Sequence, residues 1–389
     1  MKKTICQPEM RTSFRKRLDF SAKHLKKELL FPVGMLYYNK ITPLNLILEI
    51  LELMSITGKT KLYPLLFEPA YKQVFWGGSK LRTVLHRDLP EDSPAIGEAW
   101  EICDRPNISS EVVNGPLAGV TLRELVERYG SELVGKTYTG GPFPLMVKLL
   151  DAAQPISIQV HATEEFCARH ASGCEPKAEM WFVLDTEPGS MIYSGLRSTA
   201  TRQIVLSTIR ELELETQLQQ FEAVKGDAYF IPAGRVHSMS GGNLILEVSQ
   251  NSDTTFRLMD WNRVDETGEK RELHTHDAVV TMDFVDRTVS RICGASNTTS
   301  HNRKYPLVNR CPHFHCDELM LVATWRDSTG NGQSCHILTA VNRAFDVITG
   351  DGAQARVQFG ESVLIPACCG EYRIVVEAGV ETDLIRTTL

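Results

Sequence analysis

From residue 62 onward, the hydrophobic positions fall in short runs that are separated by glycine and proline. Short apolar runs bounded by turn residues are typical of β-strands, whereas helices need longer stretches with a 3.6-residue period. Strands are expected at 144–150, 156–161, 180–184, 228–231 and 244–248. The pattern therefore predicts a mainly β, antiparallel fold with helical insertions.

Two segments break this pattern and predict helices. Thr121-Leu-Arg-Glu124 matches a capping box, in which the Thr hydroxyl and the Glu carboxylate satisfy early backbone N–H groups. A short helix should run from there towards Gly130 or Gly135. Residues 200–222 form a second expected helical segment, which includes Leu218-Gln-Gln-Phe221.

The first 60 residues differ from the rest. Leu44–Met54 has the apolar spacing of an amphipathic helix, and its role could be targeting, packing or none. Residues 1–40 carry a charge of +7, which leaves −13 for the remainder of a chain whose net charge is −6. An acidic body argues against nucleic acid as the main partner, because phosphate neutralisation needs a basic face.

A repeated frame divides the rest of the chain. Gly226-Asp-Ala-Tyr-Phe-Ile-Pro232 and Gly360-Glu-Ser-Val-Leu-Ile-Pro366 share their glycine, acidic residue, isoleucine and proline. Two copies at this distance suggest two jelly-roll barrels of the cupin type. We expect an extension over 1–60, a metal-binding barrel over 61–290 with insertions at about 121–135 and 200–222, and a degenerate barrel over 300–389.

Metal chemistry is indicated in the first barrel alone. Its frame continues to His237 with the spacing Gly-x5-Pro-x-Gly-x2-His, whereas Cys368 and Cys369 follow the second frame. Residues two apart on a strand share a face, so Gln159 pairs with His161, and Lys177 pairs with Glu179. Two imidazoles, a carboxylate and an amide suit Zn²⁺ with one open position. Any one of these histidines alone could instead be a hydrogen-bonded barrel residue.

The remaining candidates are weaker. Cys311-Pro-His-Phe-His315-Cys316 looks like a metal cluster, but its histidines are expected on a strand. Ten cysteines are too few for a disulfide scaffold, and no secretory signal is evident, so reduced thiols in a cytoplasm are expected. Cys368 and Cys369 should pack as small buried residues. No phosphate-binding glycine loop and no apolar stretch long enough for a membrane span occurs.

Several motifs together resemble the type I phosphomannose isomerases, which are zinc-dependent mannose-6-phosphate isomerases, and in particular their short bacterial branch. The resemblance covers about residues 62–389, although the branch has no counterpart of residues 1–60. Its motifs are Phe75-Trp-Gly-Gly78, Ile96-Gly-Glu-Ala-Trp-Glu-Ile102, Pro144–Ala152, Ser157-Ile-Gln-Val-His161, Lys177-Ala-Glu179, Ile231–His237 and Glu247–Arg257. Two departures, Ala178 before the expected zinc ligand and His-Ala-Thr163, leave the ligand positions intact.

The resemblance implies roles for individual residues. Gln159, His161, Glu179 and His237 would be the zinc ligands, with one zinc ion per chain. Lys148, Lys177, Glu247 and Arg257 would lie in the sugar-phosphate pocket.

The residue types fit this chemistry. Aldose–ketose interconversion moves a proton between C1 and C2 through an enediol, so it needs a base and a fixed phosphate. Glu247 could be the base, with Lys177 and Arg257 as further catalytic groups. Lys148, Lys177 and Arg257 supply positive charge for the phosphate, and Ser157 a hydroxyl donor. Alternatively, Glu247 is an ion-pair partner of Arg257.

The sequence thus predicts a mannose-6-phosphate isomerase that acts in the cytoplasm as a monomer or homodimer, without nucleic acid or a membrane. An isomerase of another sugar phosphate and a non-catalytic sugar-phosphate-binding regulator are the alternatives.

Overall fold

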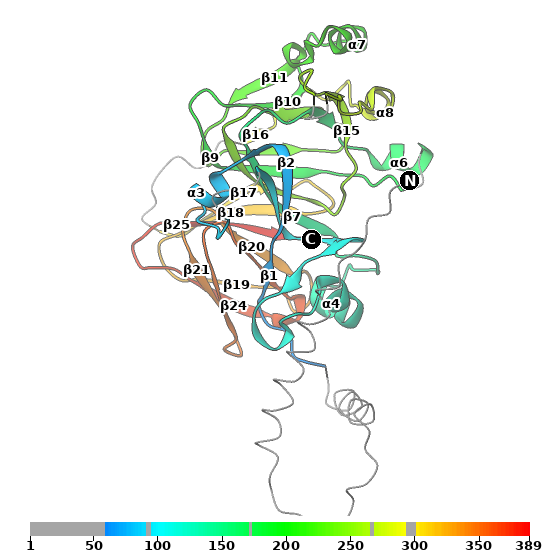
Figure 1. Ribbon diagram of the computed structural model, residues 1–389. Coiled ribbons are helices and arrows are strands. Elements are labelled where there is room, and N and C mark those ends of the chain that lie inside the picture. Colours follow the sequence, from blue (N-terminus) through cyan, green and yellow to red (C-terminus); the bar gives the residue numbers. More distant parts are fainter. Residues whose placement is uncertain (1–58, 91–94, 171–172, 265–267, 293–300) are drawn as a thin grey trace, which may run out of the picture. The chain divides into compact units, whose positions relative to one another are not determined.

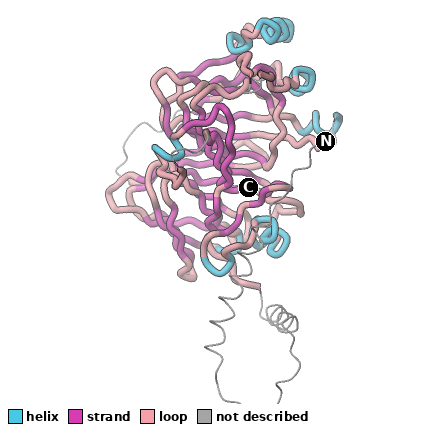
Figure 2. Tube along the Cα trace, in the orientation of Figure 1, coloured by secondary structure: helices cyan, strands magenta, loops and turns pink. Residues whose placement is uncertain are grey.

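Antiparallel strands are the main regular secondary structure of the protein, which is represented here by a computed structural model (Figures 1 and 2). The structure describes residues 59–389 except 91–94, 171–172, 265–267 and 293–300. The helix expected at 44–54 lies outside these residues. Residues 60–389 form one structural unit.

Two sheets form the first barrel. The larger has the strand order β16-β12-β9-β14-β7-β2-β3 and the smaller β11-β10-β13-β8-β15. Their bounds are β2 Ala70–Gly78, β3 Ile96–Ile102, β7 Leu145–Ala152, β8 Ile158–Val160, β9 Glu179–Thr186, β10 Met191–Leu196, β11 Leu218–Glu222, β12 Ala228–Ile231, β13 His237–Met239, β14 Asn243–Gln250, β15 Phe256–Met259 and β16 Arg291–Ile292. Side chains from both sheets meet in one apolar core, which includes Trp181, Tyr229 and Met239. The two sheets therefore face each other.

The second barrel repeats this arrangement. Its sheets have the orders β17-β18-β25-β20-β23-β1-β6 and β19-β24-β21-β22, and Phe345 and Leu338 belong to their shared core. The bounds are β1 Leu65–Glu68, β6 Glu111–Val112, β17 Arg303–Val308, β18 His315–Leu321, β19 Trp325–Ser328, β20 His336–Ala340, β21 Phe345–Thr349, β22 Gln354–Val357, β23 Ser362–Ile365, β24 Glu371–Val375 and β25 Thr382–Thr388. A two-stranded ribbon joins β4 (Asp104–Arg105) to β5 (Ile108–Ser109). The expectation of a mainly β, two-barrel cupin fold is confirmed.

The domain boundaries drawn from the sequence remain a prediction. Strands pair across them. β1 and β6, from the segment assigned by sequence to the first barrel, join the sheet of C-terminal strands. In the ladder between β1 and β23, Leu65 is the partner of Leu364.

Helices occupy the connections between strands. Their bounds are α3 Lys80–Thr83, α4 Leu122–Tyr129, α5 Ser131–Val134, α6 Glu164–His170, α7 Arg202–Glu211 and α8 Thr275–Thr281, with 3₁₀ turns η1 Gly115–Leu117, η2 Leu214–Gln217 and η3 Ala367–Cys369. The predicted capping box of Thr121 and Glu124 is present at the start of α4. None of the described helices is long and apolar enough to cross a bilayer.

One expected helix is shorter than predicted. Residues 202–211 are helical, but 218–222 form β11, which pairs with β10. Leu212 ends the helix in a left-handed conformation with φ of 60°. Pairing with β10 therefore makes 218–222 a strand, although the pattern of this short segment favours a helix.

The repeated frame has the same structure in both barrels. Gly226 and Gly360 have φ of 89° and 83°, which is the left-handed region that favours glycine. Each glycine turns the chain into a strand, β12 or β23, that ends just before the proline. Beyond the proline the two copies diverge, because β13 begins at His237 whereas η3 follows Pro366.

The central strands β7 and β14 are buried on both faces. Val147 and Leu246 belong to an apolar cluster that also contains residues of the second barrel, such as Ile337. The alternate positions, which include Lys148 and Glu247, therefore point to the opposite face, towards the first barrel's interior. Two charged side chains are thus buried in the first barrel's interior.

Candidate metal centre and active site

Strands β8, β9 and β13 bring the expected metal ligands together. His161 directly follows β8, Glu179 begins β9 and His237 begins β13. Across the ladder, His237 is the partner of Gln159. Potential ligand atoms of His161, Glu179 and His237 lie within 4.8 Å of one another, and all three side chains are buried. The four residues expected from spacing thus lie in one place.

The geometry of this cluster fits a divalent metal ion. His237 Nε2 lies 3.2 Å from Glu179 Oε1, and His161 Nε2 lies 3.4 Å from Glu179 Oε2. Ligand atoms held at about 2.0–2.1 Å in a tetrahedral site are roughly 3.3 Å apart. His161 Nε2 and Glu179 Oε1 are buried without a hydrogen bond, and Glu179 Oε2 has an ion pair with Lys177. Such atoms are costly unless a charge satisfies them.

Hydrogen bonds orient both imidazoles. His161 Nδ1 lies 3.0 Å from the Thr254 carbonyl oxygen, and His237 Nδ1 lies 2.9 Å from that of Arg235. A carbonyl can only accept, so each Nδ1 carries the proton and each Nε2 presents a lone pair to the cluster. Burial lowers the pKa of His237 to about 4, which keeps its imidazole neutral.

Gln159 lies beside the cluster, but its amide nitrogen, and not its oxygen, faces His237. Its Nε2 lies 3.3 Å from His237 Nε2, and its Oε1 accepts a hydrogen bond of 3.2 Å from Ser157 Oγ. Binding a cation through the amide oxygen would require the amide to rotate by half a turn. Ser157 is buried beside Gln159, so these contacts place its hydroxyl on the amide of an expected ligand.

Lys177 joins the cluster to Glu247. Its ammonium lies 2.7 Å from Glu179 Oε2 and 2.8 Å from Glu247 Oε1, and all three side chains are buried. Burial alone would lower the pKa of Lys177, but the two carboxylates raise it above its ordinary value. Burial would likewise raise the pKa of Glu179, yet Lys177 and both histidines lower it well below its usual range. The ammonium and the Glu179 carboxylate are therefore charged.

Glu247 does not pair with Arg257. Its Oε1 accepts from Lys177 and, at 3.2 Å, from the Ser249 hydroxyl, and its Oε2 has no partner among the described residues. Arg257 donates instead to the backbone oxygen of Glu272 at 2.7 Å. The alternative of an ion pair between Glu247 and Arg257 is therefore wrong.

Lys148 lies in an acidic and aromatic setting. Its Nζ is 3.5 Å from Glu98 Oε2, 3.8 Å from Asp253 Oδ1 and 4.5 Å from the centroid of the Trp100 ring. In the sheet it stands directly opposite Glu247. Burial alone would raise the pKa of Glu98, but Lys148 and the Trp100 N–H lower it below its ordinary value.

Some of these neighbours were missed by sequence reasoning. Glu98 and Trp100 lie in the Ile96–Ile102 motif, so a signal for them existed. Asp253 likewise lies in the Glu247–Arg257 motif, whereas Asp260 and Arg271 lie outside every motif.

The second candidate cluster does not form. His315 begins β18 and is exposed, whereas Cys311 and Cys316 are buried. His313 faces Glu164, with 3.3 Å between Nε2 and Oε1. Within the described ranges, the one group of three or more metal-type ligands is that of the first barrel.

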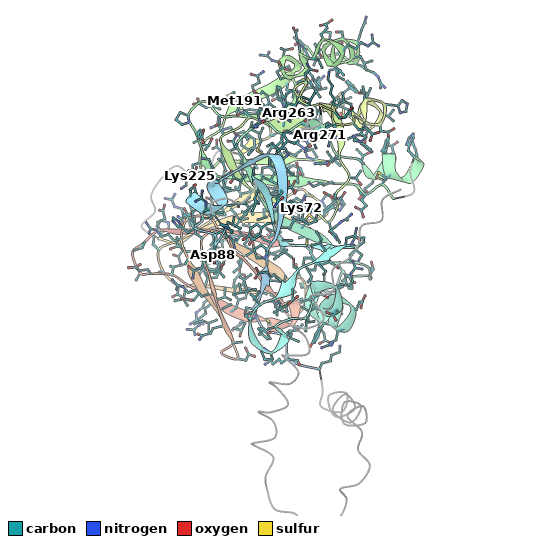
Figure 3. The ribbon with its side chains drawn as sticks, viewed as in Figure 1. Lys72, Asp88, Met191, Lys225, Arg263 and Arg271 are labelled. Atoms are coloured by element: carbon teal, nitrogen blue, oxygen red, sulfur yellow. A yellow bond between two sulfur atoms is a disulfide. The ribbon has the colours of Figure 1, made fainter. Side chains whose placement is uncertain are left out.

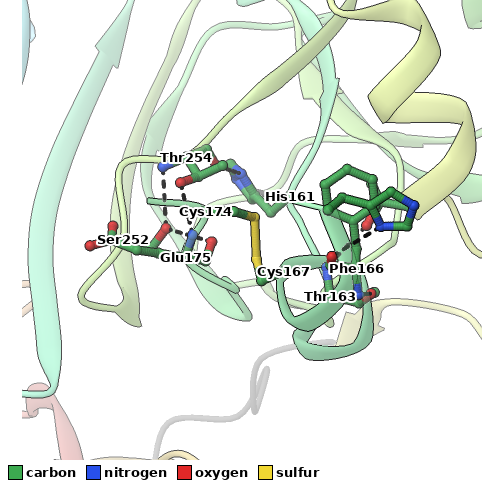
Figure 4. Close-up of a disulfide and its surroundings, with 10 residues drawn as sticks. His161, Thr163, Phe166, Cys167, Cys174, Glu175, Ser252 and Thr254 are labelled. Atoms are coloured by element: carbon green, nitrogen blue, oxygen red, sulfur yellow. Dashed lines mark hydrogen bonds between the residues drawn. A yellow bond between two sulfur atoms is a disulfide. The ribbon is translucent and has the colours of Figure 1, made fainter. Parts of the chain in front are cut away.

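Two expectations for cysteines are wrong. Cys368 is exposed and Cys369 is half-buried, because η3 places Ala367 inside and turns the next residue outward. Cys167 and Cys174 form a disulfide instead of remaining thiols (Figure 4). The chain returns after α6 and brings their Cα atoms to 5.2 Å, which is within the range of disulfides. The bond lies near His161 and Thr254.

The fold and this site define a cupin whose first barrel can hold a metal ion. The family model for the catalytic domain of type I phosphomannose isomerase matches residues 65–178. The probable mannose-6-phosphate isomerase GmuF of Bacillus subtilis is 35% identical over 227 residues, which are 58% of this chain and 70% of that protein. Mannose-6-phosphate isomerase ManA of the same organism is 37% identical over 56% of this chain and 67% of its own length.

Solved structures agree with this. The crystal structure of the Bacillus subtilis mannose 6-phosphate isomerase has a TM-score of 0.73 and 27% identity, covering 84% of this chain and all of that one. A mutant of the Salmonella typhimurium phosphomannose isomerase has a TM-score of 0.64 at 16% identity over 84% and 99% of the two chains, which shows the shared fold. The chain belongs to the type I phosphomannose isomerase family.

Proposed function

We propose that this protein interconverts mannose 6-phosphate and fructose 6-phosphate, with one zinc ion per chain. The observation that carries the proposal is Lys177, whose ammonium contacts both Glu179 of the ligand cluster and Glu247. A metal cluster, a buried cation and a carboxylate with a free oxygen are what an aldose–ketose isomerisation requires in one barrel.

Glu247 is proposed as the base. Its Oε1 is held by Lys177 and Ser249, so its orientation is fixed. Its Oε2 is left to take the proton from C2 of the open-chain sugar and return it to C1, with an enediol between the two transfers. A proton also passes from O2 to O1, so that the C1 carbonyl becomes a hydroxyl and the C2 hydroxyl becomes the carbonyl. One carboxylate can serve both transfers, because the two carbons are adjacent.

The proposed metal ligands would bind the ion through the negative charge of Glu179 and the Nε2 lone pairs of the two imidazoles. His161, Glu179 and His237, with Gln159 after rotation of its amide, would hold the zinc ion. A bound zinc ion would supply a Lewis acid that polarises the oxygens on C1 and C2. Lys177 stays protonated between its carboxylates and supplies a hydrogen-bond donor beside them.

The phosphate dianion requires positive charge in the pocket. Lys148 and Arg257 are proposed to bind it, with Lys177 and Ser157 as further donors to the substrate. Lys148 stands opposite Glu247 in the sheet, and Arg257 stands opposite Gln159. Both cations are therefore next to residues with proposed roles in the chemistry.

Further proposals follow from the sequence. The acting chain is a monomer or homodimer in the cytoplasm, the first barrel over about 61–290 carries the site, and the second barrel over 300–389 is degenerate. The extension over 1–60 has no assigned role.

The direct test is incubation of the purified protein with mannose 6-phosphate, with fructose 6-phosphate measured by a coupled assay or by NMR. Glucose 6-phosphate and ribose 5-phosphate serve as competing substrates. Turnover of mannose 6-phosphate alone is expected. Preference for another aldose phosphate would mean that this sugar phosphate, and not mannose 6-phosphate, is the substrate. Binding without turnover would favour a sugar-phosphate-binding regulator.

A further inference from the structure

Two arginines share one carboxylate at the rim of the first barrel. Arg263 lies 2.6 Å from Asp260 Oδ1, and Arg271 lies 3.3 Å from the same oxygen. Asp260 is buried, and its other oxygen, Oδ2, has no hydrogen-bond partner. Figure 3 shows both arginines beside the upper part of β2. One negative charge therefore faces two positive charges.

Arg257 adds a third positive charge. Its guanidinium forms no ion pair with a described carboxylate, and its Nε is buried without a hydrogen bond. Arg257 stands directly opposite Gln159 in the ladder between β15 and β8. Directly opposite residues on antiparallel strands share a face. The group of Arg257, Arg263 and Arg271 thus borders the proposed metal ligands.

The arginines repel one another. Burial lowers the pKa of Arg257, and Arg271 lowers it further. Burial also lowers the pKa of Arg271, and Arg263 opposes the stabilising effect of Asp260. Partly buried charges without compensation are costly. Three guanidiniums share one ion-paired carboxylate, while Glu272 and Glu98 act on Arg257 and Arg271 without an ion pair to them. The group therefore carries an excess of positive charge that suits an anion such as a phosphate monoester dianion.

Phe75 provides a platform for two of the guanidiniums. Arg263 lies 4.5 Å and Arg271 5.3 Å from the centroid of its ring. The ring is 44% exposed, so it is not buried as core. Stacking on an aromatic face limits the rotamers of an arginine and leaves its N–H groups free to bind an anion.

The turn before Arg263 is fixed to the barrel. Trp261 and Asn262 have φ of 58° and 56°, and the Trp261 indole N–H donates to the backbone oxygen of Ile156 at 2.6 Å. Arg263 donates to the neighbouring backbone oxygen of Pro155. Ser157 follows these two acceptors in the chain. The arginine group is therefore built onto the segment that leads into β8.

We propose that Arg271, positioned by Asp260 and Phe75, binds the phosphate group of the substrate together with Arg257. This proposal rests on the proposed function for the identity of the phosphate ester. The anion chemistry itself, a tetrahedral dianion bound by two guanidiniums and the ammonium of Lys148, is shared with free inorganic phosphate. Arg263 balances Asp260 and positions Arg271, and it does not itself contact the phosphate.

The test compares Arg271→Met and Arg271→Lys with a matched control, Arg326→Met, which alters an exposed arginine of β19 in the second barrel. Binding of inorganic phosphate to the full chain is measured by titration calorimetry, which needs no turnover. KM and kcat are measured with mannose 6-phosphate. Loss of a charge-assisted contact should weaken phosphate binding and raise KM by at least about tenfold in Arg271→Met. The value of kcat should stay within about threefold.

Arg271→Lys distinguishes the effect of the positive charge from that of the paired N–H donors of the guanidinium. It should recover part of the affinity, because it keeps the charge but loses paired donors. If Arg271→Met does not fold, Phe75→Leu is measured, since it removes the platform and keeps all three arginines. A severalfold rise in KM at nearly constant kcat is then expected.

The outcomes separate this proposal from the proposed function. An active isomerase whose KM and phosphate affinity are unchanged in Arg271→Met would overturn the role of Arg271 and leave the function standing. A protein without isomerase activity that binds phosphate, and loses this binding in Arg271→Met but not in Arg326→Met, would overturn the function and leave the anion site standing.

Discussion

The ammonium of Lys177 lies 2.8 Å from the carboxylate of Glu247, inside the first barrel. The same ammonium lies 2.7 Å from Glu179, so a single cation links the proposed base to the proposed metal ligands. Removing Lys177 would leave the two buried carboxylates without the cation that they share. These two contacts of Lys177 therefore predict different effects for substitutions that keep the charge of a side chain and for those that remove it.

Glu247→Gln should lower kcat by about 10²–10⁴ while metal is retained, because the amide keeps the shape of the side chain but cannot take a proton. Exchange of the C2 proton with solvent should fall in parallel. Single-turnover kinetics and metal analysis of the same sample check this. A kcat close to that of the wild type would transfer the role of base to another group.

Lys148→Met should mainly raise KM, by about tenfold or more, because the charge that binds the phosphate acts in the ground and transition states alike. Lys72→Met is the control, since Lys72 Nζ also lies over the Trp100 ring, at 4.1 Å. Steady-state kinetics of both variants, with melting temperatures to exclude misfolding, are required. A selective loss of kcat in Lys148→Met would point to a role in the chemistry instead.

Sequence reasoning predicted those features that depend on local pattern. Short apolar runs bounded by turn residues predicted the strands that carry Lys148 and Glu247, and the spacing after Gly226 predicted the position of His237. The ligands could be paired in advance because residues two apart on a strand share a face.

Features that depend on contacts between distant segments were missed. β1 joins the sheet of the second barrel, and Arg271 approaches Asp260, through packing that no local pattern encodes. The Cys167–Cys174 disulfide depends on how the chain returns after α6. The 218–222 segment became a strand because β10 offered a partner.

His336 in the second barrel should contribute a loss of stability in mild acid. Its ring is buried and hydrogen-bonded to Tyr372. Burial is the largest cause that lowers the pKa of His336 to about 4. Arg386 and Lys304 lower this pKa further, whereas Asp327 and Asp317 raise it. Between pH 6.5 and 4, the unfolded state binds a proton that the folded state does not. The contribution of His336 to the free energy of unfolding should therefore decrease as the pH falls through this window, by at most about 3 kcal/mol.

The check is a set of denaturant melts between pH 7.5 and 4.5 for the wild type and His336→Gln. The variant should lose less stability over the window, whatever its stability at pH 7.5. Parallel pH curves for the two proteins would refute the assignment.

Deletion of residues 1–58 should leave kcat within a few-fold, because every residue with a proposed role lies after residue 58. The deletion variant and the full chain are compared by kinetics and by thermal melting. A collapse of folding or a large loss of rate would show that the apolar stripe at 44–54 contributes to the core.

The central claim is that isomerisation depends on one metal ion held by His161, Glu179 and His237. It is tested by removing metal with a chelator, then titrating Zn²⁺ back while both bound metal and turnover of mannose 6-phosphate are measured. Turnover should fall to near zero and return in proportion to bound zinc, with saturation at one equivalent per chain, and His237→Ala should neither bind nor recover. Full turnover by metal-free protein, or normal recovery in His237→Ala, would contradict the account.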